Sequence, residues 1–122
     1  MQLLRLSGRK VCDKVIDKGF VWKGKTMIVR WLPGAPPRMP KDRPALYLGT
    51  LASTRLHKSA VKRNRMRRRC KEAFRLAVKN ADAKNPAQKQ PYQLLVSPRS
   101  SSLTCAFGDI ETDVSRFLST LR

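Results

Sequence analysis

The sequence predicts an α+β fold, a single-domain α-β sandwich with the element order α-β-β-α-β-α and one possible extra short strand. The length of 122 residues suits one domain with a modest core. Segments with helical apolar spacing alternate with segments rich in β-branched and aromatic residues. A helix falls between the second and third predicted strands, which permits a βαβ unit. We therefore take residues 1–122 as one domain.

A helix followed by a strand is predicted near the start of the chain. Ser7 is a suitable N-cap and Gly19 a suitable stop signal for a helix over residues 7–18. The apolar stripe of this helix is formed by Val11, Val15 and Ile16. Residues 20–32 are rich in β-branched and aromatic side chains and predict a strand whose start is made irregular by Gly24.

A proline-rich segment connects the first two predicted strands. Residues 33–44 hold five of the eight prolines of the chain, so we expect an extended connecting loop there. The apolar residues 45–53 then predict the second strand, and the polar residues 54–59 predict a turn.

A strongly basic helix follows this turn. Lys and Arg fill half of the positions from 60 to 75, and Glu72 is the only acid among them. Its predicted inner face consists of Met66, Cys70, Ala73, Phe74 and Ala77. At 100° per residue the opposite face holds Asn64, Arg68, Lys71 and Arg75, with Arg65 and Arg67 on the flanks. After a polar linker over residues 80–90, we predict a strand over 92–97 and an amphipathic helix over 109–121.

The charge balance points to a polyanionic partner. The chain has 27 basic and 8 acidic residues, a formal net charge of +19. Self-repulsion on this scale favours nucleic acid first and an anionic membrane surface second. Membrane binding is disfavoured, because the chain has no lipidation signal and no long basic helix with a large aromatic or leucine face. Without a secretory signal or a long apolar run, we expect a cytoplasmic protein.

Candidate catalytic and metal-binding groups are few. Cys12, Cys70 and Cys105 are widely spaced and His57 is the only histidine, so the sequence predicts reduced thiols, no zinc site and no organic cofactor. Asp109 and Asp113 could share a helix face and bind a metal, but acids in a first helical turn more often interact with the helix dipole. One histidine cannot form an acid–base pair. The chain alone is therefore not expected to be catalytic.

The order of residues in the basic helix is more informative about function than its charge. Arg63-Asn64-Arg65 is followed by Arg67-Arg68 and by Lys71-Glu72-Ala73-Phe74, and it is preceded by Ala60 and Val61. This run resembles the RNRxKRxxRE signature helix of the bacterial ribonuclease P protein subunit. The resemblance covers nearly the whole chain, from Arg5-Leu6 through the late Tyr-led strand to the C-terminal helix.

This resemblance implies a fold, an activity and partners. The implied fold is an α-β sandwich whose βαβ crossover has the unusual left hand. The implied activity is endonucleolytic removal of the 5′ leader from precursor tRNA. In this family the RNA subunit is the catalyst and holds Mg²⁺ together with the substrate, while the protein binds that RNA and the single-stranded leader. No catalytic or metal-ligating residue is expected in the protein, which we expect to be a monomer within the bacterial, cytoplasmic ribonucleoprotein.

The resemblance also assigns RNA-binding positions. Those on the helix and its approach are Arg55, Lys58, Lys62, Arg63, Asn64, Arg65, Arg67, Arg68 and Lys71. Their expected work is phosphate contact and neutralisation. Asn64 has two open roles, direct RNA contact and orientation of neighbouring groups.

A leader-binding cleft is implied between the first helix and one face of the sheet. Its expected positions are Cys12, Ile16, Ile28 and Arg30. The family usually has aromatic residues at the first two and often tyrosine at the last, and stacking on such rings suits single-stranded RNA. Here the cleft would rely on apolar and charged contacts. Two roles are compatible with Trp22 and Trp31, stacking on RNA and burial in the core.

Two other functions remain open from the residues alone. A structural RNA-binding protein of the ribosomal type needs only the same basic helix, and it would prefer ribosomal RNA to the ribonuclease P RNA. A DNA-binding regulator would place this helix in a major groove, but no helix-turn-helix partner is recognisable.

Overall fold

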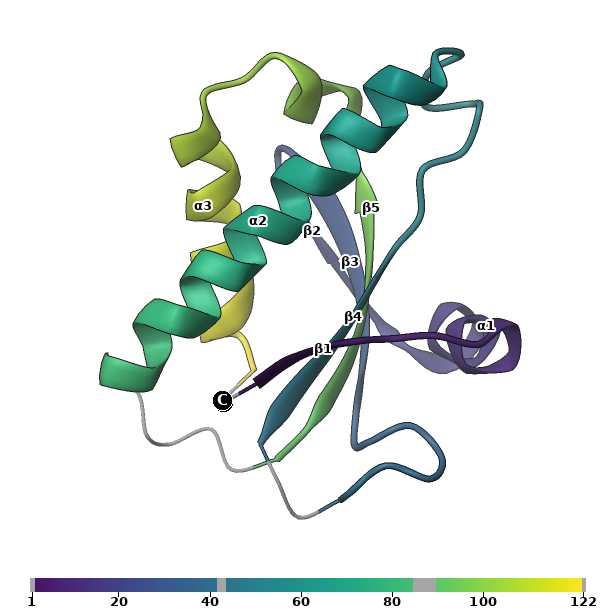
Figure 1. Cartoon of the computed structure of the whole chain (residues 1–122), viewed down its shortest axis with the longest axis vertical. Coiled ribbons are helices and arrows are strands. Elements are labelled where there is room, and N and C mark those ends of the chain that lie inside the picture. Colours follow the sequence, from purple (N-terminus) through teal and green to yellow (C-terminus); the bar gives the residue numbers. More distant parts are fainter. Residues whose placement is uncertain (1, 42–43, 85–89, 122) are drawn as a thin grey trace.

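The chain folds into one mixed sheet with helices on both faces (Figure 1). The computed structural model describes residues 2–41, 44–84 and 90–121. The strands are β1 (Gln2–Arg5), β2 (Phe20–Lys23), β3 (Met27–Pro33), β4 (Ala45–Thr50) and β5 (Tyr92–Pro98). The helices are α1 (Arg9–Lys18), α2 (Ala60–Lys84), the short 3-10 helix η1 (Ser100–Leu103) and α3 (Phe107–Ser119).

The predicted βαβ unit is present at the centre of the sheet. The strand order is β1-β4-β5-β3-β2. Strands β4 and β5 are parallel neighbours joined through α2, and β1 adds the extra strand by pairing in parallel with β4. The hairpin strands β2 and β3 run antiparallel to each other, and β3 is antiparallel to β5. The α+β sandwich and its element order are confirmed.

The alternation of side chains along the strands creates two cores. The larger core lies under α2 and α3 and includes Val29, Phe74, Leu94 and Phe117. The smaller core lies under α1 and consists of Leu6, Val15, Ala45, Tyr47 and Leu95. Because successive side chains of a strand point to opposite faces, each central strand contributes to both cores. Figure 1 shows α2 and α3 side by side on one face and α1 alone on the other.

The strand predicted over 20–32 is instead a hairpin. It breaks at a turn in which the Gly24 N–H donates to the Met27 carbonyl at 2.8 Å. Thr26 in this turn donates its N–H and its hydroxyl to the Asp113 carboxylate at 2.7 and 2.6 Å. A side chain at Gly24 would collide with the Trp22 ring and with Asp113. The turn therefore depends on a residue of α3 that is distant in sequence.

The ends of four other predicted elements also differ from the structure. Helix α1 begins at Arg9, and its N-cap is Gly8 at φ 100° rather than Ser7. Strand β4 ends at Thr50, and α3 begins at Phe107. Helix α2 continues to Lys84, into the segment expected as a linker.

The proline-rich loop joins strands that are not neighbours, because β5 lies between β3 and β4. The Gly34 N–H donates to the Pro91 carbonyl at 2.8 Å and holds the loop at the beginning of β5. Within this predicted loop, residues 42–43 lie outside the described residues, as do residues 85–89 of the predicted linker.

Candidate nucleic-acid interface

The start of the basic helix is fixed by its own turn. Ser59 caps α2, since its hydroxyl accepts the Lys62 N–H at 3.3 Å and its carbonyl accepts the Arg63 N–H at 3.0 Å. The His57 ring is half-buried, and its Nδ1 accepts the Ser59 N–H at 3.0 Å. Arg63 donates to the carbonyls of His57 and Lys58 at 2.9 and 3.2 Å. Arg63 and His57 thus shape the turn before the helix.

The outer surface of α2 carries most of the predicted RNA-binding side chains. Lys62, Asn64, Arg65, Arg68 and Lys71 are exposed there, and Arg55 and Lys58 are exposed on the turn before the helix. The only acid in the run, Glu72, pairs with Arg75 at 2.5 Å, and this hydrogen bond lowers the pKa of the Glu72 carboxyl. Among the described residues, Glu72 forms an ion pair with Arg75 and with no other cation of this face.

Asn64 has a visible orienting role. Its side-chain oxygen accepts a hydrogen bond from Arg67 Nη2 at 2.7 Å, one turn further along the helix. This contact fixes the guanidinium of a half-buried arginine. Of the two roles left open for Asn64, orientation of a neighbouring side chain is therefore present in the structure.

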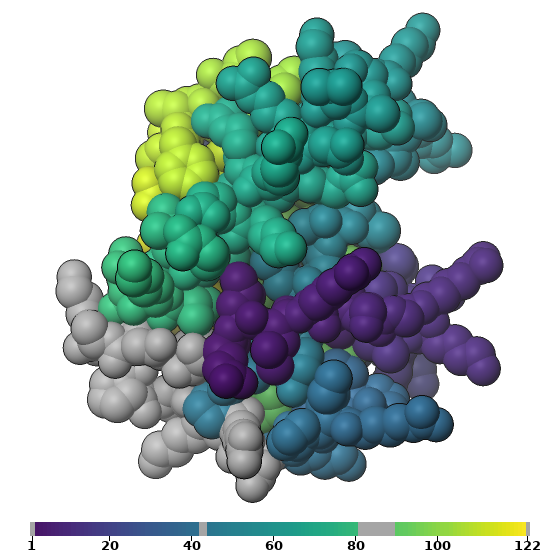
Figure 2. All heavy atoms as spheres, in the orientation of Figure 1, coloured from purple at the N-terminus to yellow at the C-terminus, as the bar shows by residue number. Residues whose placement is uncertain are grey.

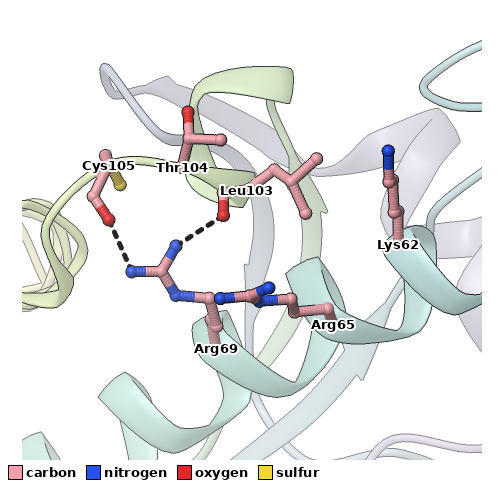
Figure 3. Close-up of a pocket in the computed structure, with 6 residues that line it drawn as sticks. All are labelled: Lys62, Arg65, Arg69, Leu103, Thr104 and Cys105. Carbon is pink, nitrogen blue, oxygen red and sulfur yellow. Dashed lines mark hydrogen bonds between the residues drawn. The ribbon is translucent and has the colours of Figure 1, made fainter.

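Arg69 has a structural role, and it was not among the residues predicted from the sequence. It points inward from α2 and donates to the carbonyls of Ser102, Leu103 and Cys105 at 2.6, 3.0 and 2.6 Å. Figure 3 shows its guanidinium directed at the segment after η1, while Lys62 and Arg65 project from the same side of α2. Arg69 joins the basic helix to the polypeptide leading into α3. Its position between Arg68 and the buried Cys70 is the sequence signal for this role.

A cationic pocket connects the basic helix with the first helix. We use this name for the hollow of about 290 Å³ whose cations are Arg5, Arg67 and Lys71. Cys12 of α1 lines it, and its apolar lining includes Leu6, Leu48 and Leu95. Figure 2 shows the surface hollowed between the teal surface of α2 and the purple N-terminal segment. None of the residues that line the pocket is acidic.

One nitrogen atom at the cationic pocket is without a partner. The Nε of Arg67 is buried and makes no hydrogen bond to any described residue, although Nη2 of the same side chain is held by Asn64. A buried N–H of a guanidinium costs free energy unless an acceptor is supplied. Because this atom is buried, a phosphate in the pocket would contact Arg67 through other N–H groups of the guanidinium, which arginine presents as planar, paired donors.

The residues predicted for the leader cleft lie on the α1 side of the sheet. Cys12 is half-buried, and Ile16 is 43% exposed on α1. Ile28 and Arg30 are half-buried on β3 and alternate with Val29, which belongs to the core on the other face. Of these four predicted cleft residues, only Cys12 lines the cationic pocket.

Both tryptophans lie on the opposite side of the sheet. Trp22 packs against Phe117 of α3 with ring centroids 5.6 Å apart. Trp31 packs against Tyr92 and Phe117 at 5.9 and 6.3 Å. Both tryptophans therefore pack against the larger core, and they do not supply the aromatic rings that the predicted cleft positions lack.

The thiols and acids form no obvious reactive centre in the described residues. The three cysteines are free, and burial raises the pKa of the Cys70 thiol to about 12. Asp113 is 3% exposed and is bound by Thr26, so its role is structural. No group of three or more His, Cys, Asp or Glu residues that could hold a metal ion occurs in the part of the chain described. Nor does that part contain a helix long and apolar enough to cross a membrane.

Comparison with known proteins identifies the family. The family model for ribonuclease P matches residues 2–122. The ribonuclease P protein of Thermotoga maritima has the same fold, with a TM-score of 0.70, 18% identity and coverage of 97% of each chain. The Staphylococcus aureus RNase P protein gives a TM-score of 0.68 and 17% identity, covering 97% of this chain and 94% of that one.

No curated protein matches the sequence significantly. The family match spans nearly the entire chain, however, and sets aside the ribosomal and DNA-binding alternatives. The chain belongs to the bacterial ribonuclease P protein family, and it is a protein subunit of the ribonuclease that processes tRNA, a partner of ribonuclease P RNA.

Proposed function

We propose that this subunit uses the outer face of α2 to bind ribonuclease P RNA and uses the cationic pocket, with the cleft beside α1, to receive the single-stranded 5′ leader of precursor tRNA. The observation that carries the proposal is the cationic pocket itself. It brings Arg5, Arg67 and Lys71 together with Cys12 of the cleft, and none of its lining residues is acidic.

The two parts of this surface suit two kinds of RNA. The exposed cations of α2 lie along one helix, and they can contact phosphates of a structured RNA at the spacing of its turns. The cleft residues on α1 and β3 are apolar except for Arg30, so they suit a base and its phosphate in an unpaired strand. Without aromatic rings there, binding of the leader should depend more on charge than on stacking.

We place the hydrolytic step in the RNA subunit. The protein contributes positive charge close to the substrate, which lowers the repulsion between two polyanions. Magnesium ions held by the RNA and the substrate would supply the metal chemistry of cleavage. In this arrangement one copy of the protein acts as a monomer in the cytoplasmic ribonucleoprotein.

The proposal is tested by 5′ processing of a precursor tRNA with a cognate ribonuclease P RNA at low magnesium concentration. The wild-type protein is compared with an Arg65→Ala/Arg68→Ala double variant. Both side chains are exposed and neither makes a hydrogen bond to a described residue, so the variant should fold normally. We expect at least a tenfold loss of stimulation, because two phosphate contacts are removed.

The matched control is a Lys25→Ala/Arg116→Ala variant, which removes the same charge from exposed positions on the β2–β3 turn and α3. It should stimulate nearly as well as wild type. Equal stimulation by wild type and the Arg65/Arg68 variant would remove α2 from the RNA interface. An equal loss in both double variants would mean that only total charge matters.

A second comparison tests the cationic pocket. Lys71→Ala should weaken processing of a substrate with a long leader more than that of a substrate with a single leader nucleotide. If both substrates lose equally, the pocket contacts the RNA subunit or the tRNA body and not the leader.

A further inference from the structure

A second basic pocket lies on the other flank of α1. We name it the lysine pocket. It is a hollow of about 400 Å³ between α1, the loop after β3 and strand β5. Lys10 and Lys14 of α1 line it, whereas Cys12 of the same helix lines the cationic pocket. At 100° per residue these two sets of side chains point in widely different directions from the helix axis. Figure 2 shows purple α1 and the blue loop after β3 next to each other.

The rim of the lysine pocket is positively charged. Its cations are Lys10, Lys14 and Lys41, all exposed, and none of its lining residues is acidic. Asp13 and Asp17 lie three residues beyond Lys10 and Lys14, but no ion pair between these side chains is formed in the structure. These three lysines form no ion pair with a described acid, and three ammonium groups around one hollow favour an anionic ligand.

The floor of the lysine pocket combines apolar surface with one buried amide. Val11, Ala35 and Pro37 supply the apolar surface. Gln93 also lines the pocket and is only 6% exposed. Its strand neighbour on the same face, Leu95, is part of the apolar core under α1.

Gln93 has an incomplete set of hydrogen bonds. Its amide nitrogen donates one long bond, of 3.4 Å, to the Gly34 carbonyl, and no described residue donates to its side-chain oxygen. The Gln93 oxygen is not among the buried unpartnered atoms of the described residues, so it is an acceptor open to a ligand in the pocket that Gln93 lines. A ligand group that both donates and accepts at the floor of the pocket would complete the set.

We propose that the lysine pocket binds one nucleotide of single-stranded RNA. The phosphate lies among the three lysines, the base lies over Val11, Ala35 and Pro37, and the base edge meets Gln93. The volume of about 400 Å³ is within the range of small-ligand sites. Lysine is a flexible point charge, so the pocket tolerates variation in the position of the phosphate and discriminates mainly at the base edge.

This inference rests on the proposed function, because it gives an RNA-binding subunit a second RNA contact. It is nevertheless separate from the face of α2 and from the cationic pocket. The pockets on the two flanks of α1 would then each bind a nucleotide, either of one unpaired RNA strand or of two different strands.

The test is a titration of the full ¹⁵N-labelled chain with a single-stranded adenosine pentanucleotide, followed by NMR. The expected result is a change in the side-chain NH₂ signals of Gln93 and in the backbone amides of Val11 and Ala35. In a Lys10→Ala/Lys14→Ala variant the affinity measured from these signals should fall about fivefold, since two phosphate partners are lost. The Lys25→Ala/Arg116→Ala variant should change it less than twofold.

A Gln93→Leu variant separates the base contact from the charge. This variant retains a side chain at the floor of the pocket and all three lysines. It should lower the affinity for the pentanucleotide several-fold and leave the binding of inorganic phosphate unchanged. Adenosine monophosphate distinguishes a free nucleotide from a polymer. Binding of the pentanucleotide at least as tight as that of the mononucleotide supports an RNA site.

Three results would overturn the proposal. One is that the NMR signals changed by the pentanucleotide are confined to α2 and the cationic pocket, which would leave the proposed function intact. Another is an equal response of the lysine pocket to inorganic phosphate, with no change at Gln93, which would make it a simple anion site. The third is full affinity in the Lys10/Lys14 variant. Failure of the proposed function would appear separately, as a loss of stimulation in the precursor tRNA assay.

Discussion

Neighbouring residues of α2 have different physical roles. Arg68 is exposed and makes no hydrogen bond within the described chain, whereas Arg69 binds three backbone carbonyls. Asn64 holds Arg67 and so acts through another side chain. A basic run therefore contains exposed, structural and orienting positions, and only the contacts of each side chain distinguish them.

Asp113 is predicted to be a major contributor to stability. Replacement by alanine leaves the N–H and hydroxyl of Thr26, which is 2% exposed, without an acceptor. The expected loss in the free energy of unfolding is about 2–4 kcal/mol. Urea denaturation measures it, with Glu111→Gln on the exposed face of the same helix as the control. A loss below about 0.5 kcal/mol would show that the hairpin turn does not need this carboxylate.

Cys70 should make stability depend on alkaline pH. Burial raises the pKa of its thiol from 9.0 to about 12, so between these values the unfolded chain loses a proton that the folded chain keeps. The stabilisation is complete below pH 9 and is lost as pH rises, by about 1.4 kcal/mol per pH unit. Urea unfolding of wild type and Cys70→Ala under reducing conditions isolates this effect. Their difference in stability should shrink between pH 9 and 11, and a constant difference would contradict the prediction.

At the scale of elements, α2 carries an exposed cationic face and also contributes to the larger core. Its inward side chains Met66, Cys70 and Phe74 are fully buried, while its outer face is cationic. The helix can carry so many like charges because burial of this apolar stripe, rather than pairing of charges, holds it in place.

The junction between α2 and α3 is predicted to depend on Arg69. Arg69→Gln removes charged hydrogen bonds to three carbonyls and should lower the free energy of unfolding by about 2–3 kcal/mol. Thermal unfolding followed by circular dichroism measures the loss. Arg68→Ala is the matched control, with little change in stability and a clear loss of RNA affinity. Equal stability losses in the two variants would contradict the division of roles.

For the whole molecule, the net charge of +19 predicts RNA binding that weakens steeply with salt. Binding of ribonuclease P RNA is measured between about 50 and 200 mM monovalent salt. Removing two phosphate contacts in Arg65→Ala/Arg68→Ala should reduce the slope of log affinity against log salt by roughly 1.4 to 1.8. The Lys25→Ala/Arg116→Ala variant should leave the slope nearly unchanged. Equal slopes in all three proteins would mean that α2 makes no direct phosphate contacts.

The sequence by itself determined the α+β class, the order of the main elements and the basic helix with its inner and outer faces. These features depend on local composition and on periodicity, which are properties of short segments. The RNR-centred run also indicated the family, because its spelling is specific within one helix.

Only the tertiary structure decided which distant residues meet. The pairing of β1 with β4, the bond from Thr26 to Asp113 and the bonds of Arg69 all join segments far apart in the chain. The cationic pocket likewise needs residues of β1, α1, β4 and α2 together. No periodicity in the sequence records such contacts, because they arise only when the two faces of the sheet are covered and the chain closes on itself.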